Sequence, residues 1–363
     1  MTCPVGTDVS RAAGILRDGG LVAFATETVY GLGASALDPA ALARLFEVKN
    51  RPRFDPIIAH ISDVTGLPQL AAEIPPVARS LAERFWPGPL TLVLRKTQIT
   101  PDLLTAGLPS VAVRVPAHPL ALELLRAVSF PVAAPSANLF GHVSPTTAEH
   151  VAEQLGDKID YILDGGPCRV GLESTVLDLT GAIPVLLRPG GLPVEEIEAL
   201  IGPVTIRRAN SSDEAEAQLA PGMLPRHYAP RTRLVIVENI EPPEAGKRIG
   251  LLTFRPPTTN LLSDRMQERE GEALAEPTPN SPNALPSEPP PPSRGRAGVG
   301  GAFAAIEVLS PAGDLREAAA NFFAALRRLD ALGLDAIVAV PFPNEGLGRA
   351  LNDRLQRAAN SQR

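Results

Sequence analysis

Short apolar runs alternate with amphipathic helical segments through the first 205 residues of the chain. Residues 21–26 (LVAFAT) form an apolar run of strand length, and they follow a helical pattern over 7–17 that two glycines end. Asp38 and Pro39 then supply an N-cap residue and a first-turn proline for the next helix. Because helices and strands in such an order pack as layers around one core, the pattern predicts a compact α/β domain over residues 1–205.

The remaining elements of this domain follow from the same periodicities. Residues 111–115 (VAVRV) alternate cleanly, so Arg114 is expected to point away from the face that carries its three valines. Further strands are predicted at residues 57–61, 90–94, 132–134, 161–163, 175–179 and 185–187, and a further helix at 77–85.

A second α/β pattern fills residues 233–363, after a polar linker at 206–232. Within it, residues 256–301 are dominated by Pro, Ser, Glu, Asn and Gly, and cannot bury enough apolar surface to offset their ordering entropy, so we interpret them as a disordered insertion. The linker ends in RHYAP, where an aromatic residue is unusual: Tyr228 either packs the linker onto a domain or stacks over a ligand as part of a lid. The other predicted elements are strands at 234–237, 249–253, 304–308 and 336–340, and helices at 315–330 and 346–358.

Charge and cysteine content restrict the class of protein. The chain carries 34 Lys and Arg against 40 Asp and Glu, a net charge of -6, which argues against wrapping nucleic acid by bulk charge. No apolar run approaches the roughly 18 residues that cross a bilayer, and we expect no secretory signal. Cys3 and Cys168 are far apart and outside any zinc-type cluster, which favours a reducing, cytoplasmic setting.

Ordinary phosphate-binding motifs are missing from the sequence. There is no GxxxxGK[ST] loop and no strand-linked GxGxxG, so a bound nucleotide would be held by cationic side chains and loop amides. Lys49, Arg51 and Arg53 lie within five positions, as a phosphate chain requires, although cations there would also complement the dipole of the helix before them.

Polar side chains also follow several predicted strands. Thr26 ends one strand, in a segment that a polar turn would equally explain. Arg114 is either exposed or clamps a carboxylate, and His60, alone in an apolar strand, is more typical of a core residue. The other candidates are Ser136 and Asn138 in a small-residue turn, and Ser174, Thr175 and Arg188 at the ends of later strands. Together they suggest a site for a nucleotide and a small polar acid, without a metal or nucleophile cluster.

Eight motifs in fixed order then carry a resemblance to a known family. FATETVYGLG, KNRP, WPGPLTLVL, VAVRVPAHP, APSAN, GLESTV, LLRPG and RHYAP together resemble the threonylcarbamoyl-AMP synthase family in its long form. The resemblance implies a YrdC-like twisted open α/β sheet around a large basic cavity (1–205), a linker or lid (206–232), and a smaller Rossmann-like C-terminal domain (233–363).

The resemblance also implies a reaction. L-Threonine, bicarbonate or CO2, and ATP would give threonylcarbamoyl-AMP and pyrophosphate, for modification of the tRNA adenosine next to the anticodon. Mg²⁺ would be bound mainly through the ATP phosphates, and tRNA threonylcarbamoyl transferase proteins would be downstream partners, with no stable nucleic-acid or membrane binding. The alternative from a different class is an RNA-binding module acting in translation or ribosome maturation.

Roles of individual residues are implied only through the matching motifs. Two departures from the family pattern stand among them: Ala25 replaces a proline, and Asp55 replaces an asparagine and adds a negative charge near the cations. The resemblance implies Lys49 and Arg51 as catalytic, phosphate-binding cations; Ser136, Asn138, Arg188, His227 and Tyr228 as further ATP-binding residues; and Thr26, His60, Arg114 and Ser174 as the threonine-binding group.

Overall fold

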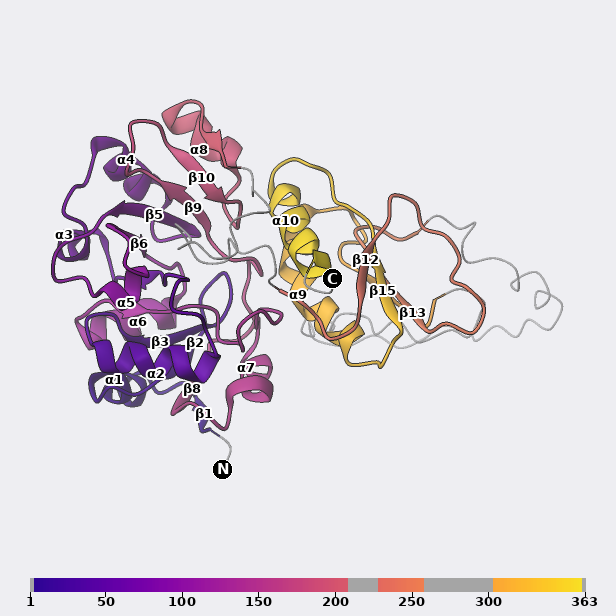
Figure 1. Cartoon of the computed structure of the whole chain (residues 1–363), viewed down its shortest axis with the longest axis horizontal. Helices are drawn as coiled ribbons and strands as arrows, with labels where there is room; N and C mark the ends of the chain where they lie inside the picture. Colours follow the sequence, from indigo (N-terminus) through magenta and orange to yellow (C-terminus); the bar gives the residue numbers. More distant parts are fainter. Residues whose placement is uncertain (1–2, 208–227, 258–302, 361–363) are drawn as a thin grey trace, which may run out of the picture.

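The computed structural model describes residues 3–207, 228–257 and 303–360, which form two units, each built on one β-sheet (Figure 1). We call residues 3–207 the N-terminal unit, and residues 231–257 with 303–360 the C-terminal unit. His227 with most of the predicted linker, and residues 258–301 of the predicted insertion, lie outside the described residues.

The N-terminal unit is an α/β domain, as the alternating pattern predicted, and its sheet is mixed. Its strand order is β1-β8-β2-β3-β7-β4-β6-β5-β9-β10-β11, so β1 and β11 are its edges, and it contains both parallel and antiparallel pairs. The strands are β1 Val5–Gly6, β2 Val22–Phe24, β3 Gly31–Ser35, β4 Ala59–His60, β5 Leu90–Arg95, β6 Ser110–Arg114, β7 Val132–Ala133, β8 Tyr161–Leu163, β9 Thr175–Asp178, β10 Val185–Arg188 and β11 Thr205–Ile206.

Helix starts in this unit follow the capping signals of the sequence. The Asp38 carboxylate accepts a hydrogen bond from the Ala40 amide at the start of α2, with Pro39 in its first turn. At the other end of α2, Asn50 adopts a left-handed conformation (φ 50°), which turns the chain directly after Lys49. The helices are α1 Val9–Arg17, α2 Pro39–Lys49, α3 Leu67–Leu70, α4 Pro76–Phe85, α5 Asp102–Thr105, α6 Pro119–Val128, α7 Ala148–Leu155 and α8 Val194–Ile201.

Several elements differ from the sequence-based expectation. Residues Gly31–Ser35 form β3 between β2 and β7, a strand that the sequence pattern did not predict. The predicted strand at 57–61 is regular only over Ala59–His60, and α6, α7 and α8 were not predicted. The N-terminal sheet also extends to β11, which pairs in parallel with β10.

The C-terminal unit has a Rossmann-like four-stranded sheet. All its strand pairs are parallel, in the order β12-β15-β13-β14, and its core joins sheet residues such as Leu252 and Ile337 to Phe322. In Figure 1 its helices lie between its sheet and the N-terminal unit. Its elements are β12 Leu234–Ile236, β13 Ile249–Thr253, β14 Ala305–Val308, α9 Leu315–Asp330, β15 Ala336–Ala339 and α10 Leu347–Asn360.

The two units contact each other through these helices. Gly171, in a left-handed conformation (φ 72°), lies so close to α9 that an added Cβ would be 2.4 Å from the Ala319 carbonyl oxygen. On α10, Arg349 Nη2 lies 3.1 Å from Glu195 Oε1 of α8. The docking therefore combines backbone approach with ion pairing.

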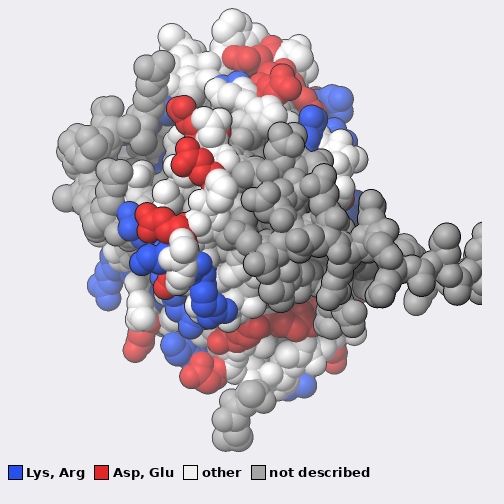
Figure 2. Space-filling view, turned by 90° about the vertical axis from the view of Figure 1, so that its right-hand side faces the viewer, with Lys and Arg blue, Asp and Glu red and all other residues white. Residues whose placement is uncertain are grey.

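The face of the molecule on the side of the C-terminal unit carries both positive and negative side chains. Figure 2 shows acidic and basic side chains interspersed where side chains are described on this face, without one extended basic patch. In the described part of the chain, no helix combines the length and hydropathy needed to cross a membrane.

One titratable side chain is enclosed within the N-terminal sheet. His60 is 3% exposed on β4, directly beside Arg114 of β6 in the parallel register. Burial, with the positive charge of Arg114, lowers the pKa of His60 to about 3. The imidazole is therefore neutral in the folded protein at ordinary pH.

We predict that His60 makes folding sensitive to acid. The unfolded chain protonates this imidazole near pH 6.5 but the folded chain only near pH 3, so the free energy of unfolding decreases as pH falls between these values, by up to about 1.4 kcal/mol per pH unit. Between pH 7.5 and pH 5.0, the free energy of unfolding measured with urea should fall by about 2 kcal/mol more for the wild type than for His60→Gln. Equal losses for both proteins would contradict the prediction.

Candidate functional site

A cavity in the N-terminal unit gathers side chains from strand ends that are distant in sequence. It encloses about 520 Å³ of empty space when its open mouth is included. Residues after β2, before β4, at the end of β6, after β7, before β9 and at the end of β10 contribute to it. The lining consists of Thr26, Thr28, Val29, Gly31, Arg51, Ile58, His60, Arg114, Ala134, Pro135, Ser136, Glu173, Ser174, Arg188 and Tyr228.

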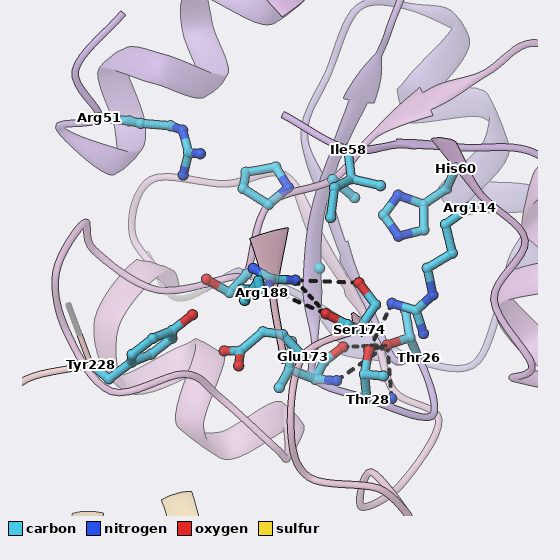
Figure 3. Close-up of a pocket in the computed structure, with 15 residues that line it drawn as sticks. Thr26, Thr28, Arg51, Ile58, His60, Arg114, Glu173, Ser174, Arg188 and Tyr228 are labelled. Atoms are coloured by element: carbon cyan, nitrogen blue, oxygen red, sulfur yellow. Dashed lines mark hydrogen bonds between the residues drawn. The ribbon is translucent and has the colours of Figure 1, made fainter. Parts of the chain in front are cut away.

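The labelled side chains divide the cavity into two ends. Figure 3 shows Arg51 and Tyr228 on one side and His60, Arg114, Thr26 and Thr28 on the other. Arg188, Ser174 and Glu173 lie between them. We call these the Arg51 end and the Arg114 end.

At the Arg114 end, the guanidinium is fixed by oxygen atoms around it. Its Nη2 lies 2.6 Å from Glu27 Oε1, its Nη1 donates to Thr28 Oγ1 at 2.9 Å, and its Nε donates to the Gly88 carbonyl at 3.1 Å. Glu27 is held in turn by the Ala117 amide. These contacts use three of the five N–H groups of the guanidinium, which leaves two for a ligand.

The hydroxyl of Thr26 belongs to the same end. It donates to the Val29 carbonyl at 2.6 Å and lies 2.7 Å from Thr28 Oγ1. Since Thr28 also accepts from Arg114, the turn after β2 and the end of β6 form one hydrogen-bonded wall.

At the Arg51 end, the cation is held by the loop that follows it. Arg51 Nη2 lies 2.9 Å from Asp55 Oδ2 and 2.7 Å from the Pro56 carbonyl oxygen. Burial lowers the pKa of Arg51, and the Asp55 carboxylate opposes that shift. The negative charge expected near the cations is therefore directly paired with Arg51.

Lys49 lies behind the cavity wall rather than on it. Its ammonium donates to the Ser136 carbonyl at 2.6 Å and to the Asn138 carbonyl at 2.5 Å. Burial, with the charge of Arg51, lowers the pKa of Lys49 well below its ordinary value. Lys49 thus fixes the turn that carries Ser136 to the cavity.

Between the two ends, Arg188 holds Ser174. Its Nη2 donates to the Ser174 carbonyl at 2.9 Å, and the Ser174 hydroxyl lies 2.7 Å from Thr91 Oγ1. Burial lowers the pKa of Arg188.

Tyr228 borders the cavity from the end of the predicted linker. Its buried ring packs against Phe323 of α9, with ring centroids 5.6 Å apart, and the residue has a left-handed backbone (φ 63°). The next residue is anchored, because the Ala229 amide donates to the Gly141 carbonyl at 2.8 Å. Tyr228 therefore packs this end of the linker between the two units while also lining the cavity.

The structure brings most of the predicted site residues together. Asn138 and Lys49 are buried next to the cavity without lining it, Arg53 is exposed, and His227 lies outside the described residues. Lining the cavity are Thr26, Arg51, His60, Arg114, Ser136, Ser174, Arg188 and Tyr228.

Two carboxylates near the cavity were not assigned roles from the sequence. Glu27 pairs with Arg114, and Glu173 lines the cavity and accepts from Ser144 Oγ at 2.6 Å. Each is adjacent to a predicted site hydroxyl within a quoted motif, Glu27 to Thr26 and Glu173 to Ser174, and that adjacency was the available signal. Within the described residues, no cluster of three His, Cys, Asp or Glu side chains is arranged to hold a metal.

Comparison with protein families places both units. Residues 14–190 match a family described as Telomere recombination, and residues 192–360 match the Threonylcarbamoyl-AMP synthase, C-terminal domain. The boundary between these matches precedes α8 and β11, and β11 still pairs with β10 of the N-terminal sheet.

Relatives match along nearly the whole chain. A threonylcarbamoyl-AMP synthase from Pyrococcus abyssi is 45% identical over 350 residues, covering 96% of this chain and 93% of the relative, and one from Bacillus subtilis is 40% identical, covering 98% and 93%. The crystal structure of P. abyssi Sua5 complexed with L-threonine has a TM-score of 0.81 and 39% identity, covering 100% of this chain and 98% of that one. Because both family models match and these relatives match along nearly the whole chain, this chain belongs to the threonylcarbamoyl-AMP synthase family.

Proposed function

We propose that this chain forms threonylcarbamoyl-AMP and pyrophosphate from L-threonine, bicarbonate or CO2, and ATP within the described cavity. The observation that carries the proposal is the convergence of Arg51, Arg114 and Arg188 on one cavity lined by hydroxyls. Both organic substrates carry anionic groups, and a site that joins them must offset their mutual repulsion. The relatives bear the name of this activity, and one related structure contains L-threonine.

We assign threonine to the Arg114 end. The two remaining guanidinium N–H groups suit a carboxylate, which accepts bidentate hydrogen bonds from arginine. Thr26 and Ser174 supply hydroxyls for the polar groups of the amino acid, while neutral His60 adds no competing positive charge. Charge and hydrogen-bonding capacity at this end match a small amino acid.

We assign the triphosphate and adenosine to the Arg51 end and the centre of the cavity. Arg51 and Arg188 supply positive charge, and Tyr228 supplies an aromatic edge. Lys49 adds its charge from behind the Ser136 turn, with two of its three N–H groups engaged by carbonyls. His227 stays a predicted contact of the nucleotide.

The oxygen atoms near the Ser136 turn fit a magnesium ion that arrives with ATP. Ser136 lines the cavity, and among the described residues the buried Asn138 Oδ1 has no hydrogen-bond partner. Mg²⁺ prefers oxygen ligands and is commonly held by few protein groups together with substrate phosphates. Ser136 and Asn138 would hold the ion, which supplies further neutralisation of phosphate charge.

The chemistry then needs positioning rather than a covalent intermediate. The threonine nitrogen attacks CO2 and loses a proton, giving a carbamate. A carbamate oxygen attacks the α-phosphorus of ATP as the bond to the β-phosphate oxygen breaks, and pyrophosphate leaves. Arg51 and Arg188 stabilise charge on the phosphates, and Arg114 holds the amino acid in line. Water must be excluded from the labile carbamate and the mixed anhydride, and most of the predicted lid at residues 206–232 lies outside the described residues.

The wider setting follows from the product. Threonylcarbamoyl-AMP supplies a threonylcarbamoyl group to the tRNA adenosine next to the anticodon, so downstream transferase proteins are the proposed partners. Cys3 and Cys168 are free thiols, which suits a cytoplasmic location. We propose residues 1–205 as the catalytic domain and 233–363 as the C-terminal domain.

We predict that turnover requires no RNA. Purified protein should release pyrophosphate from ATP only when threonine and bicarbonate are both present, and mass spectrometry should detect threonylcarbamoyl-AMP. If the protein shows no turnover but binds RNA tightly and with steep salt dependence, the alternative of an RNA-binding module is favoured.

A further prediction concerns the role of Arg114 in threonine binding. Arg114→Ala should raise the Kd for threonine about 10- to 100-fold, because a charge-assisted contact of about 1.5–3 kcal/mol is lost, and should change the Kd for ATP much less. Calorimetry measures both constants. Arg95→Ala is the matched control, since Arg95 lies on the neighbouring strand β5 in an exposed pair with Glu73. Equal losses for both ligands in Arg114→Ala would contradict the assignment.

A further inference from the structure

The C-terminal unit contributes one fully buried cation to the surroundings of the cavity. Arg354 on α10 is 0% exposed, although arginine is almost never completely buried without partners. It lies in the C-terminal unit, whereas the cavity lining comes from the N-terminal unit and Tyr228.

Arg354 pairs with Asp353 of the same helix, its Nη1 lying 2.5 Å from Asp353 Oδ2, and its other contacts reach the cavity wall. Its Nε donates to Glu173 Oε2 at 2.8 Å, and its Nη2 donates to the carbonyl of Pro189, the residue after Arg188, at 3.0 Å. The guanidinium carbon also lies 5.0 Å from the centroid of the Tyr228 ring. One side chain thus reaches a cavity carboxylate, a cavity aromatic ring and the strand end that carries a cavity cation.

The ion pair between Arg354 and Glu173 matters because of the negative charge of Glu173. Glu173 is 7% exposed and borders the space that we assign to two anionic substrates. The charged partner found for its carboxylate is Arg354, while its other oxygen accepts from the neutral Ser144 hydroxyl. Without Arg354, a buried negative charge would face the substrates in a low-dielectric setting.

We propose that Arg354 is a positioning residue that neutralises Glu173 and supports Tyr228, so that the cavity binds anions only when the C-terminal unit is docked. The proposal rests on the proposed function. Arg354 touches neither substrate in this account. The C-terminal unit completes the electrostatics of a site whose reacting groups bind elsewhere.

The test is a charge-rescue cycle in the full-length protein. Arg354→Gln should raise the KM for ATP and for threonine about 30-fold, since Glu173 is left unpaired. Adding Glu173→Gln should return both KM values to within about threefold of Glu173→Gln alone. A purely structural role would instead lower the active fraction, and hence the maximal rate, at unchanged KM. Unchanged KM in Arg354→Gln, or absent rescue, overturns the proposal.

Arg349→Gln is the matched control, because Arg349 lies on the same helix and pairs with Glu195 across the same interface without touching the cavity. Its KM values should equal those of the wild type. If Arg354→Gln does not fold, the double variant with Glu173→Gln is measured instead: KM values within about threefold of Glu173→Gln alone support the proposal, and higher KM values or a failure to fold overturn it. If the wild type makes no threonylcarbamoyl-AMP, the proposed function fails, while calorimetric Kd values for ATP still test Arg354.

Discussion

The burial of guanidinium groups is the constraint on which the site depends. A buried cation is costly unless protein oxygen atoms replace the water that it loses. Arg51 is paired with Asp55 and Arg114 with Glu27, while Arg188 donates to the Ser174 carbonyl. Because these bonds also fix each guanidinium in one orientation, the cavity is organised for anions before a ligand arrives.

Local signals in the sequence were sufficient to predict many of the helices and strands. The Asp38 N-cap and Pro39 set the start of α2 through contacts within one turn, so they can be interpreted without knowledge of the fold. The strand β3 is different, because Gly31 and Gly33 are typical of a turn. An added Cβ on Gly33 would lie 3.0 Å from Phe24 and 3.1 Å from Val132, so glycine here serves the close approach of neighbouring strands, and that approach is a property of tertiary packing.

The site was predictable to the extent that its residues lie in motifs at strand ends. Residue type identified Arg51, Arg114 and Arg188 as cations for anionic ligands, and the topology gathers them into one cavity. Residue type could not show that Lys49 faces two carbonyls of the Ser136 turn from behind the wall. The role of Arg354 could not be predicted either. In the sequence it is one of several charged residues on a helix, and its partner Glu173 lies 181 positions away.

The close approach at Gly171 restricts how this enzyme can diverge. The loop there touches the backbone of α9 with no side chain between them, only two residues before Glu173. Interfaces made of side chains can be repacked by compensating substitutions. At Gly171 the contact is with backbone atoms, so a larger residue there cannot be accommodated by changing a side chain on α9. The interface between the two units therefore tolerates little change at this position. Replacing either unit by that of a distant relative should give a folded protein only where the replacement keeps the same close contact between the Gly171 loop and the backbone of α9.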